Sequence, residues 1–107
     1  MAWIQLIAAG LLEIVWATAM KESAGFTRPI PTSITVLAMI ASFALLAAAM
    51  KTLPLGTSYM IWTGIGAVGA FIAGAILFGE ALTPLRIAAA VLIVAGMALM
   101  KIATPQG

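Results

Sequence analysis

The sequence predicts an all-α integral membrane protein whose four transmembrane helices form a single domain over residues 1–107. The chain is 64% hydrophobic and only 7% charged, whereas soluble domains carry about 25% charged residues. Its few charges separate four apolar spans, and each span is near the roughly 20 residues that cross about 30 Å of hydrocarbon. The spans are continuously apolar rather than alternating, which is not the pattern of a transmembrane β-barrel.

The four helices are expected at residues 2–20, 33–50, 57–78 and 84–103. The first contains a glutamate well inside its apolar span, Glu13, and the second and third contain no charge. The fourth has Arg86 near its start and follows Thr83-Pro84. Threonine before proline is typical of an N-cap followed by the first helical residue, so this helix should begin at Pro84.

The composition also excludes several classes of function. The chain has no cysteine and no histidine, so thiolate and imidazole metal sites are ruled out, and we expect no metal and no cofactor. A net charge of +2 from eight charged residues is too little for a nucleic-acid-binding patch. The expected surroundings of most side chains are therefore membrane lipid or other helices.

The basic residues are divided almost evenly between the two ends of the predicted bundle. Lys21, Arg28 and Arg86 fall on one side, and Lys51, Lys101 and the α-amine fall on the other. The positive-inside rule needs a clear excess on one side. Either another feature orients the chain, or it inserts in both orientations and two copies pair antiparallel. Such a pair would supply the inverted repeat from which many transporters are built.

Glu13 is the strongest functional candidate, because it lies roughly 10 Å inside its span by helix rise. A charged carboxylate there costs about 2.5–3.5 kcal/mol on insertion scales, and intramembrane acids usually mark ion or proton paths. A neutral, hydrogen-bonded structural glutamate is the alternative. Burial favours the protonated carboxyl and a bound cation favours the carboxylate, so a proton and a cation would compete for it. Gly10 and Trp16 share its helical face, where a small residue permits close approach and an indole can hold a cation.

Polar and aromatic residues in the second and third spans could complete a site around this glutamate. Ser42 could hydrogen-bond Glu13 or bond back to its own helix. Tyr59 and Trp62 share one face of the third span, where they would form either an interfacial belt or a pocket wall. Trp62 lies about 8 Å from the start of its span by helix rise. That depth would bring it near Glu13 of an antiparallel partner.

Glycines in the third span have two readings. Gly64 and Gly66 lie within the helix, where glycine permits bending. Gly66, Ala70 and Gly74 also form a stripe of small residues, which suits close contact between helices. A hinge and ordinary bundle packing are both compatible with this pattern.

Taken together, these residues resemble the small multidrug resistance transporters along the whole chain. The matching features are the early Glu13, Gly25-Phe26-Thr27-Arg28, the segment Gly56-Thr57-Ser58-Tyr59-Met60-Ile61-Trp62-Thr63-Gly64-Ile65-Gly66, and Leu92-Ile93-Val94-Ala95-Gly96. Within that family the chain is most similar to the guanidinium exporter subtype (the Gdx or SugE group), because Trp16 stands where multidrug members have a small residue. Ala89 departs from the glycine often found in the family's fourth helix.

The resemblance implies an antiparallel homodimer in the plasma (inner) membrane of a prokaryote that exchanges protons for guanidinium, a transporter rather than an enzyme. It implies that Glu13 binds either ion, that Gly10 leaves room beside it, and that Trp16 and Ser42 hydrogen-bond it. Tyr59 and Trp62 would line the pocket, and Gly64 and Gly66 would form a kink in the third helix. Leu92, Ile93 and Gly96 would lie in the dimer seam. It suggests no mechanism for Lys101. The sequence leaves open an exporter of quaternary ammonium ions, a passive cation channel, a non-transporting scaffold, and a heterodimer with a related chain.

Overall fold

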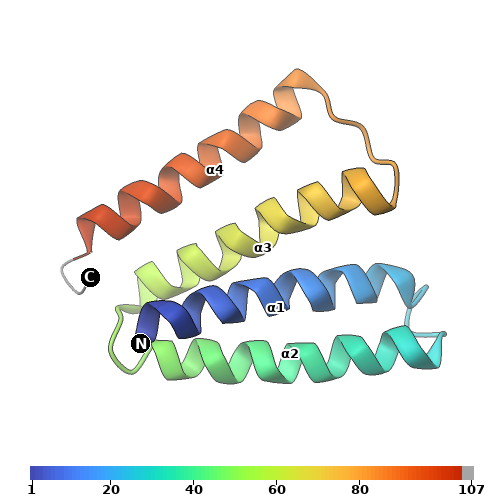
Figure 1. The fold of residues 1–107 in the computed structure, drawn as a ribbon, viewed down its shortest axis with the longest axis horizontal. Helices are drawn as coiled ribbons and strands as arrows, with labels where there is room; N and C mark the ends of the chain where they lie inside the picture. Colours follow the sequence, from blue (N-terminus) through green and yellow to red (C-terminus); the bar gives the residue numbers. More distant parts are fainter. Residues whose placement is uncertain (105–107) are drawn as a thin grey trace.

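The computed structural model describes residues 1–104, which form four α-helices joined by short connections (Figure 1). They are α1 (Ala2–Glu22), α2 (Pro29–Ala49), α3 (Leu55–Leu77) and α4 (Pro84–Ala103). Each is long and apolar enough to cross a membrane, so the predicted all-α, four-span organisation is confirmed for this part of the chain. The last residues of the expected domain, 105–107, lie outside the described residues.

Prolines set the starts of three helices. Helix α2 begins at Pro29, earlier than expected, because the extended backbone of Arg28 leads directly into a proline at the first helical position. Helix α3 begins after Pro54, whose backbone is also extended. In α4 the Thr83 hydroxyl accepts a hydrogen bond from the Arg86 backbone N–H at 3.2 Å, which confirms the predicted cap.

A tight turn joins α1 to α2 and is organised by the fully buried side chain of Ser23. The Ser23 hydroxyl donates to the Met20 carbonyl at 2.6 Å and accepts from the Phe26 N–H at 3.0 Å. Ala24, Gly25 and Phe26 all have positive φ, at 49°, 75° and 66°. Left-handed backbone at alanine and phenylalanine is uncommon, so these hydrogen bonds hold the turn in a conformation that the two residues do not favour.

The helices lie side by side in a flat layer in the order α2, α1, α3, α4 (Figure 1). The described chain measures 43 × 34 × 16 Å. Helix α1 packs against both α2 and α3, and the main core lies where these three helices meet near the N-terminal end of α1. That core consists of Leu6, Ala9, Leu46, Ala49, Leu53, Ile61 and Trp62.

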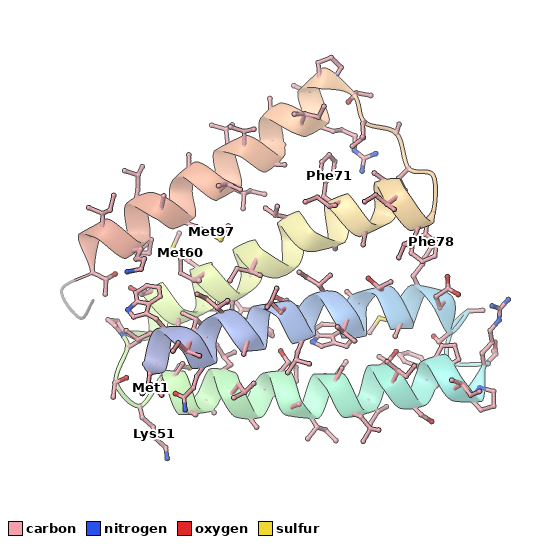
Figure 2. All side chains as sticks on the ribbon, viewed as in Figure 1. Met1, Lys51, Met60, Phe71, Phe78 and Met97 are labelled. Atoms are coloured by element: carbon pink, nitrogen blue, oxygen red, sulfur yellow. The ribbon has the colours of Figure 1, made fainter. Side chains whose placement is uncertain are left out.

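Helix α4 stands apart from this three-helix unit. Within residues 1–104 its backbone packs only against α3, and none of its 20 residues is buried. Its apolar side chains include Leu92, which is 72% exposed. Figure 2 shows Met60 and Met97 in the space between α3 and α4. An apolar helix with so little cover within its own chain presents its surface to lipid or to another chain.

Candidate functional site

The carboxyl group of Glu13 lies near the middle of α1, against α3. It fits against Gly66, where an added β-carbon would overlap both Oε1 and the carboxyl carbon of Glu13. The Glu13 side chain is half-buried, and its Oε1 is buried with no hydrogen-bond partner among residues 1–104. Buried polar atoms in native proteins nearly always have a partner, so such an atom is a candidate ligand site.

Glycines let α1 and α3 approach each other closely around Glu13. Gly69 on α3 makes room for Ile14 in the same way that Gly66 makes room for Glu13. In return, Gly10 on α1 faces Ile65, whose Cβ would lie 2.8 Å from a β-carbon at position 10. The room that Gly10 was expected to leave beside Glu13 is therefore taken by Ile65. On both α1 and α3, glycine therefore makes space for a side chain of the other helix.

Ser42 connects α2 to both neighbouring helices. Its hydroxyl donates to the Ala9 carbonyl on α1 at 2.7 Å and accepts from the Trp62 indole N–H on α3 at 3.0 Å. This differs from the expected hydrogen bond between Ser42 and Glu13. A serine hydroxyl has a single proton, and in this structure that proton is directed to Ala9, so Ser42 donates no hydrogen bond to Glu13.

A row of four aromatic side chains runs across α1, α2 and α3. The Trp16 and Phe43 ring centroids are 6.3 Å apart, those of Phe43 and Trp62 are 5.8 Å apart, and those of Tyr59 and Trp62 are 5.5 Å apart. Phe43 links the two tryptophans and was not singled out from the sequence, because one phenylalanine among apolar residues carries no functional signal. Its position next to Ser42 was the available clue.

Trp16 brings a second unpaired polar atom to this region. Its Nε1 is buried and has no hydrogen-bond partner among residues 1–104, so the expected bond to Glu13 is not made in this structure. Glu13 offers a free acceptor for N–H groups, and the aromatic faces favour positive charge. This combination suits a small cation that has N–H groups for the carboxylate. The Trp16 N–H is itself a donor, so it can bond a carboxylate but not such a cation.

The residues expected in the dimer seam line a groove between α3 and α4. Leu92, Ile93 and Gly96 share this groove of about 430 Å³ with Tyr59 and Gly64. A β-carbon at Gly64 would meet the Met97 side chain, whereas one at Gly96 would meet no atom within 4 Å. Tyr59 thus belongs to the aromatic row and also borders this groove.

Comparison with known proteins identifies the family. The family model described as Small Multidrug Resistance protein matches residues 1–94. The chain belongs to the small multidrug resistance family. A relative named guanidinium exporter, from Escherichia coli (strain K12), is 57% identical over 104 residues, which cover 97% of this chain and 99% of that protein. Guanidinium exporters of Citrobacter freundii and Salmonella typhimurium are each 55% identical with the same coverage. Four helices that are long and apolar enough to cross a membrane, together with relatives that are bacterial exporters, indicate a multi-pass membrane protein.

Proposed function

We propose that this small multidrug resistance protein is an antiporter that exports guanidinium in exchange for protons, with Glu13 as the shared binding site. The observation that carries the proposal is the Glu13 carboxyl, which lies inside the helical unit with a buried oxygen that no residue among 1–104 satisfies. The names of its relatives support guanidinium as the cation.

The chemistry of the Glu13 carboxyl fits this exchange. Guanidinium is planar and permanently charged, and it can give two parallel N–H bonds to one carboxylate. A protonated carboxyl cannot accept the same pair of bonds, so a proton and guanidinium exclude each other. Alternating exposure of this one site to the two sides of the membrane would couple their opposite movements.

The proposed working unit is an antiparallel homodimer. The flat shape of the described chain and the exposure of α4 leave apolar surface for a second copy to cover. The even division of basic residues between the two ends supports insertion in both orientations. Two copies would bring two Glu13 carboxyl groups into one site. Protonation of one carboxyl would then affect protonation of the other.

The deciding experiment is guanidinium uptake into proteoliposomes that contain a pH-sensitive dye. Wild type should move protons in the direction opposite to guanidinium, and Glu13→Gln should move neither. Glu22→Gln is the matched control, because it removes an exposed carboxylate from the end of the same helix. If wild type carries quaternary ammonium ions but not guanidinium, the substrate assignment is wrong. Guanidinium current without proton movement would indicate a channel, and no transport of either cation would indicate a scaffold.

The orientation can be tested separately because the chain contains no cysteine. The variant Lys51→Cys places one cysteine in the connection between α2 and α3. An impermeant thiol reagent should label it both in intact cells and in inverted vesicles, which expose opposite sides of the membrane. Labelling from one side only would contradict dual topology and leave the transport proposal standing.

A further inference from the structure

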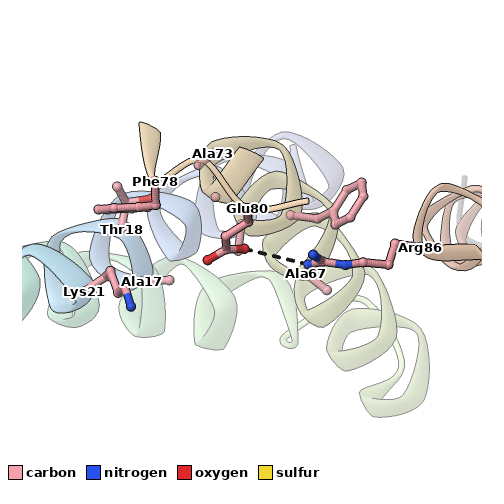
Figure 3. Close-up of a pocket in the computed structure, with 11 residues that line it drawn as sticks. Ala17, Thr18, Lys21, Ala67, Ala73, Phe78, Glu80 and Arg86 are labelled. Carbon is pink, nitrogen blue, oxygen red and sulfur yellow. Dashed lines mark ion pairs between the residues drawn. The ribbon is translucent and has the colours of Figure 1, made fainter. Parts of the chain in front are cut away.

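A cavity with charged residues in its lining lies at the end of the molecule where α1 and α3 finish and α4 begins (Figure 3). Its volume is about 300 Å³. Ala17 and Ala70 line it, and each lies one helical turn beyond a residue of the central site, Glu13 on α1 and Gly66 on α3. The cavity therefore extends from the charged end of the bundle to within about one turn of Glu13.

The mouth of this cavity already holds a guanidinium group, that of Arg86. The Arg86 Nη1 donates to the Ala81 carbonyl at 2.7 Å, and its Nη2 lies 3.7 Å from the Glu80 carboxylate (Figure 3). The guanidinium carbon is 5.3 Å from the centroid of the Phe71 ring. A carboxylate, a carbonyl and an aromatic face are all groups that bind guanidinium in proteins.

We propose that Glu80, Phe71 and the Ala81 carbonyl form an outer site for guanidinium, which the substrate enters by displacing the Arg86 side chain. The inference rests on the proposed function and adds to it the route by which the cation reaches or leaves Glu13. Displacement replaces one guanidinium group with another, so the contacts of the site are preserved. Arg86 then moves into water, where its charge is hydrated.

Two features make the exchange feasible. The Glu80 and Arg86 side chains are both 43% exposed, and their separation of 3.7 Å is longer than the roughly 2.7–2.9 Å of a strong charge-assisted bond. Exposed pairs of this kind contribute little stability. Glu80 is also held without Arg86, because its backbone N–H donates to the Gly74 carbonyl at 3.1 Å and its carboxyl occupies the space beside Gly74.

Lys21 is the other charge that lines the cavity, and it sets the strength of the site. Its Nζ lies 6.0 Å from the centroid of the Phe78 ring. With Lys21 and Arg86 both present, the mouth carries two cations and one carboxylate, so an incoming cation is partly repelled. The outer site therefore binds guanidinium weakly and releases it readily, as a site on a transport route should.

Binding can be measured without transport. In Glu13→Gln protein labelled with ¹⁵N-arginine and held in detergent, the Arg86 Nε–H signal is assigned by its loss in Arg86→Lys. Guanidinium should shift this signal saturably, sodium at equal ionic strength should not, and adding Glu80→Gln should abolish the shift. Equal responses to the two salts, or a shift that survives Glu80→Gln, would overturn the outer site whatever the fate of the proposed function.

Transport kinetics supply the second arm. Glu80→Gln should raise the apparent KM for guanidinium about two- to fivefold, because an exposed ion pair contributes a free energy that corresponds to an affinity change of about this size. The turnover rate at saturating guanidinium should change less. Arg86→Lys should lower KM, because lysine keeps the charge but lacks the planar fork that competes with the substrate. If the Glu80–Arg86 pair served only to hold the structure together, both variants would impair transport. If only the charge at position 86 affected binding, Arg86→Lys would have no effect, because lysine keeps that charge.

Lys51→Arg, which changes an exposed cation at the other end of the bundle, serves as the control and should leave KM unchanged. If wild type exchanges guanidinium and neither Glu80→Gln nor Arg86→Lys alters KM, the outer site is wrong while the exchanger proposal stands. If wild type shows no exchange, the proposed function is wrong, and the arginine signal still decides whether the outer site exists.

Discussion

The carboxyl group of Glu13 on α1 occupies the space that a β-carbon would fill at Gly66 on α3. The glycine therefore determines where the carboxyl lies, because any side chain at position 66 would push it toward another position. Glu13 and Gly66 form one structural unit although they are on different helices. Gly66, which the sequence suggests as a point of backbone bending, also contacts the candidate site directly.

Gly66→Ala should impair transport more than it impairs folding. The atoms that a β-carbon would meet belong to the flexible end of the Glu13 side chain, which can rotate away. Displacement of a binding group by about 1 Å can cost on the order of a hundredfold in activity. We expect guanidinium exchange to fall roughly ten- to a hundredfold, while the thermal unfolding temperature in detergent changes little.

Gly10→Ala is the matched comparison for Gly66→Ala. Its β-carbon would meet Cβ and Cγ2 of Ile65 at 2.8 Å, and a β-branched side chain near its own backbone has little freedom to move. This variant should lower the unfolding temperature by forcing α1 and α3 apart. If the two alanine variants lose stability equally, the direct contact between Gly66 and the site is not what limits transport.

Ser42→Ala should destabilise the three-helix unit. It removes the acceptor of the Trp62 N–H and the donor to the Ala9 carbonyl, both in buried surroundings. An orphaned buried donor costs about 1–2 kcal/mol, near the upper end for hydrogen bonds inside membrane proteins. Thermal unfolding in detergent measures the loss. Ser33→Ala, which removes only an exposed bond to the Pro29 carbonyl of the same helix, should behave like wild type.

The fold could be predicted from the sequence because hydrophobic length alone identifies membrane helices. The four spans and the Thr83 cap depend on local composition, so the sequence predicts them. The sequence predicts a later start for α2 than the structure shows, because proline usually interrupts a helix, whereas Pro29 and Pro31 fit its first turn. The order of the helices in the layer depends on contacts between distant residues, which local composition does not encode.

The candidate site was predictable only in part. Glu13 stands out because a charge inside an apolar span is costly, and Trp16, Ser42 and Trp62 stand out as polar or aromatic residues among aliphatic ones. The bonds that Ser42 makes could not be predicted, because a single hydroxyl proton has several acceptors within reach. Phe43 was missed because apolar residues look alike in an apolar span, yet it connects two tryptophans.

The pH dependence of transport follows from competition for Glu13. Protonation occupies the carboxyl that guanidinium needs, so the apparent KM for guanidinium should rise as the pH falls. The limiting change is about tenfold per pH unit when one proton excludes one cation. Initial uptake rates at several symmetric pH values measure it, and Glu22→Gln should keep the same slope. A KM independent of pH, with proton movement still present, would place the proton and the cation on different groups.

The contact between Lys101 and Trp3 should stabilise the far end of α4. The Lys101 Nζ lies 4.6 Å from the centroid of the Trp3 ring, and it connects α4 to α1, although the backbones of these two helices do not pack against each other. An exposed cation–aromatic contact contributes about 0.5–1 kcal/mol. Lys101→Gln should therefore lower the unfolding temperature of the protein in detergent, and Lys101→Arg should largely preserve it. Lys51, which extends away from the bundle (Figure 2), gives the control Lys51→Gln with no expected change. If Lys101→Gln and Lys51→Gln lower the unfolding temperature equally, then charge at the membrane surface, and not the contact with Trp3, is the source of the stability.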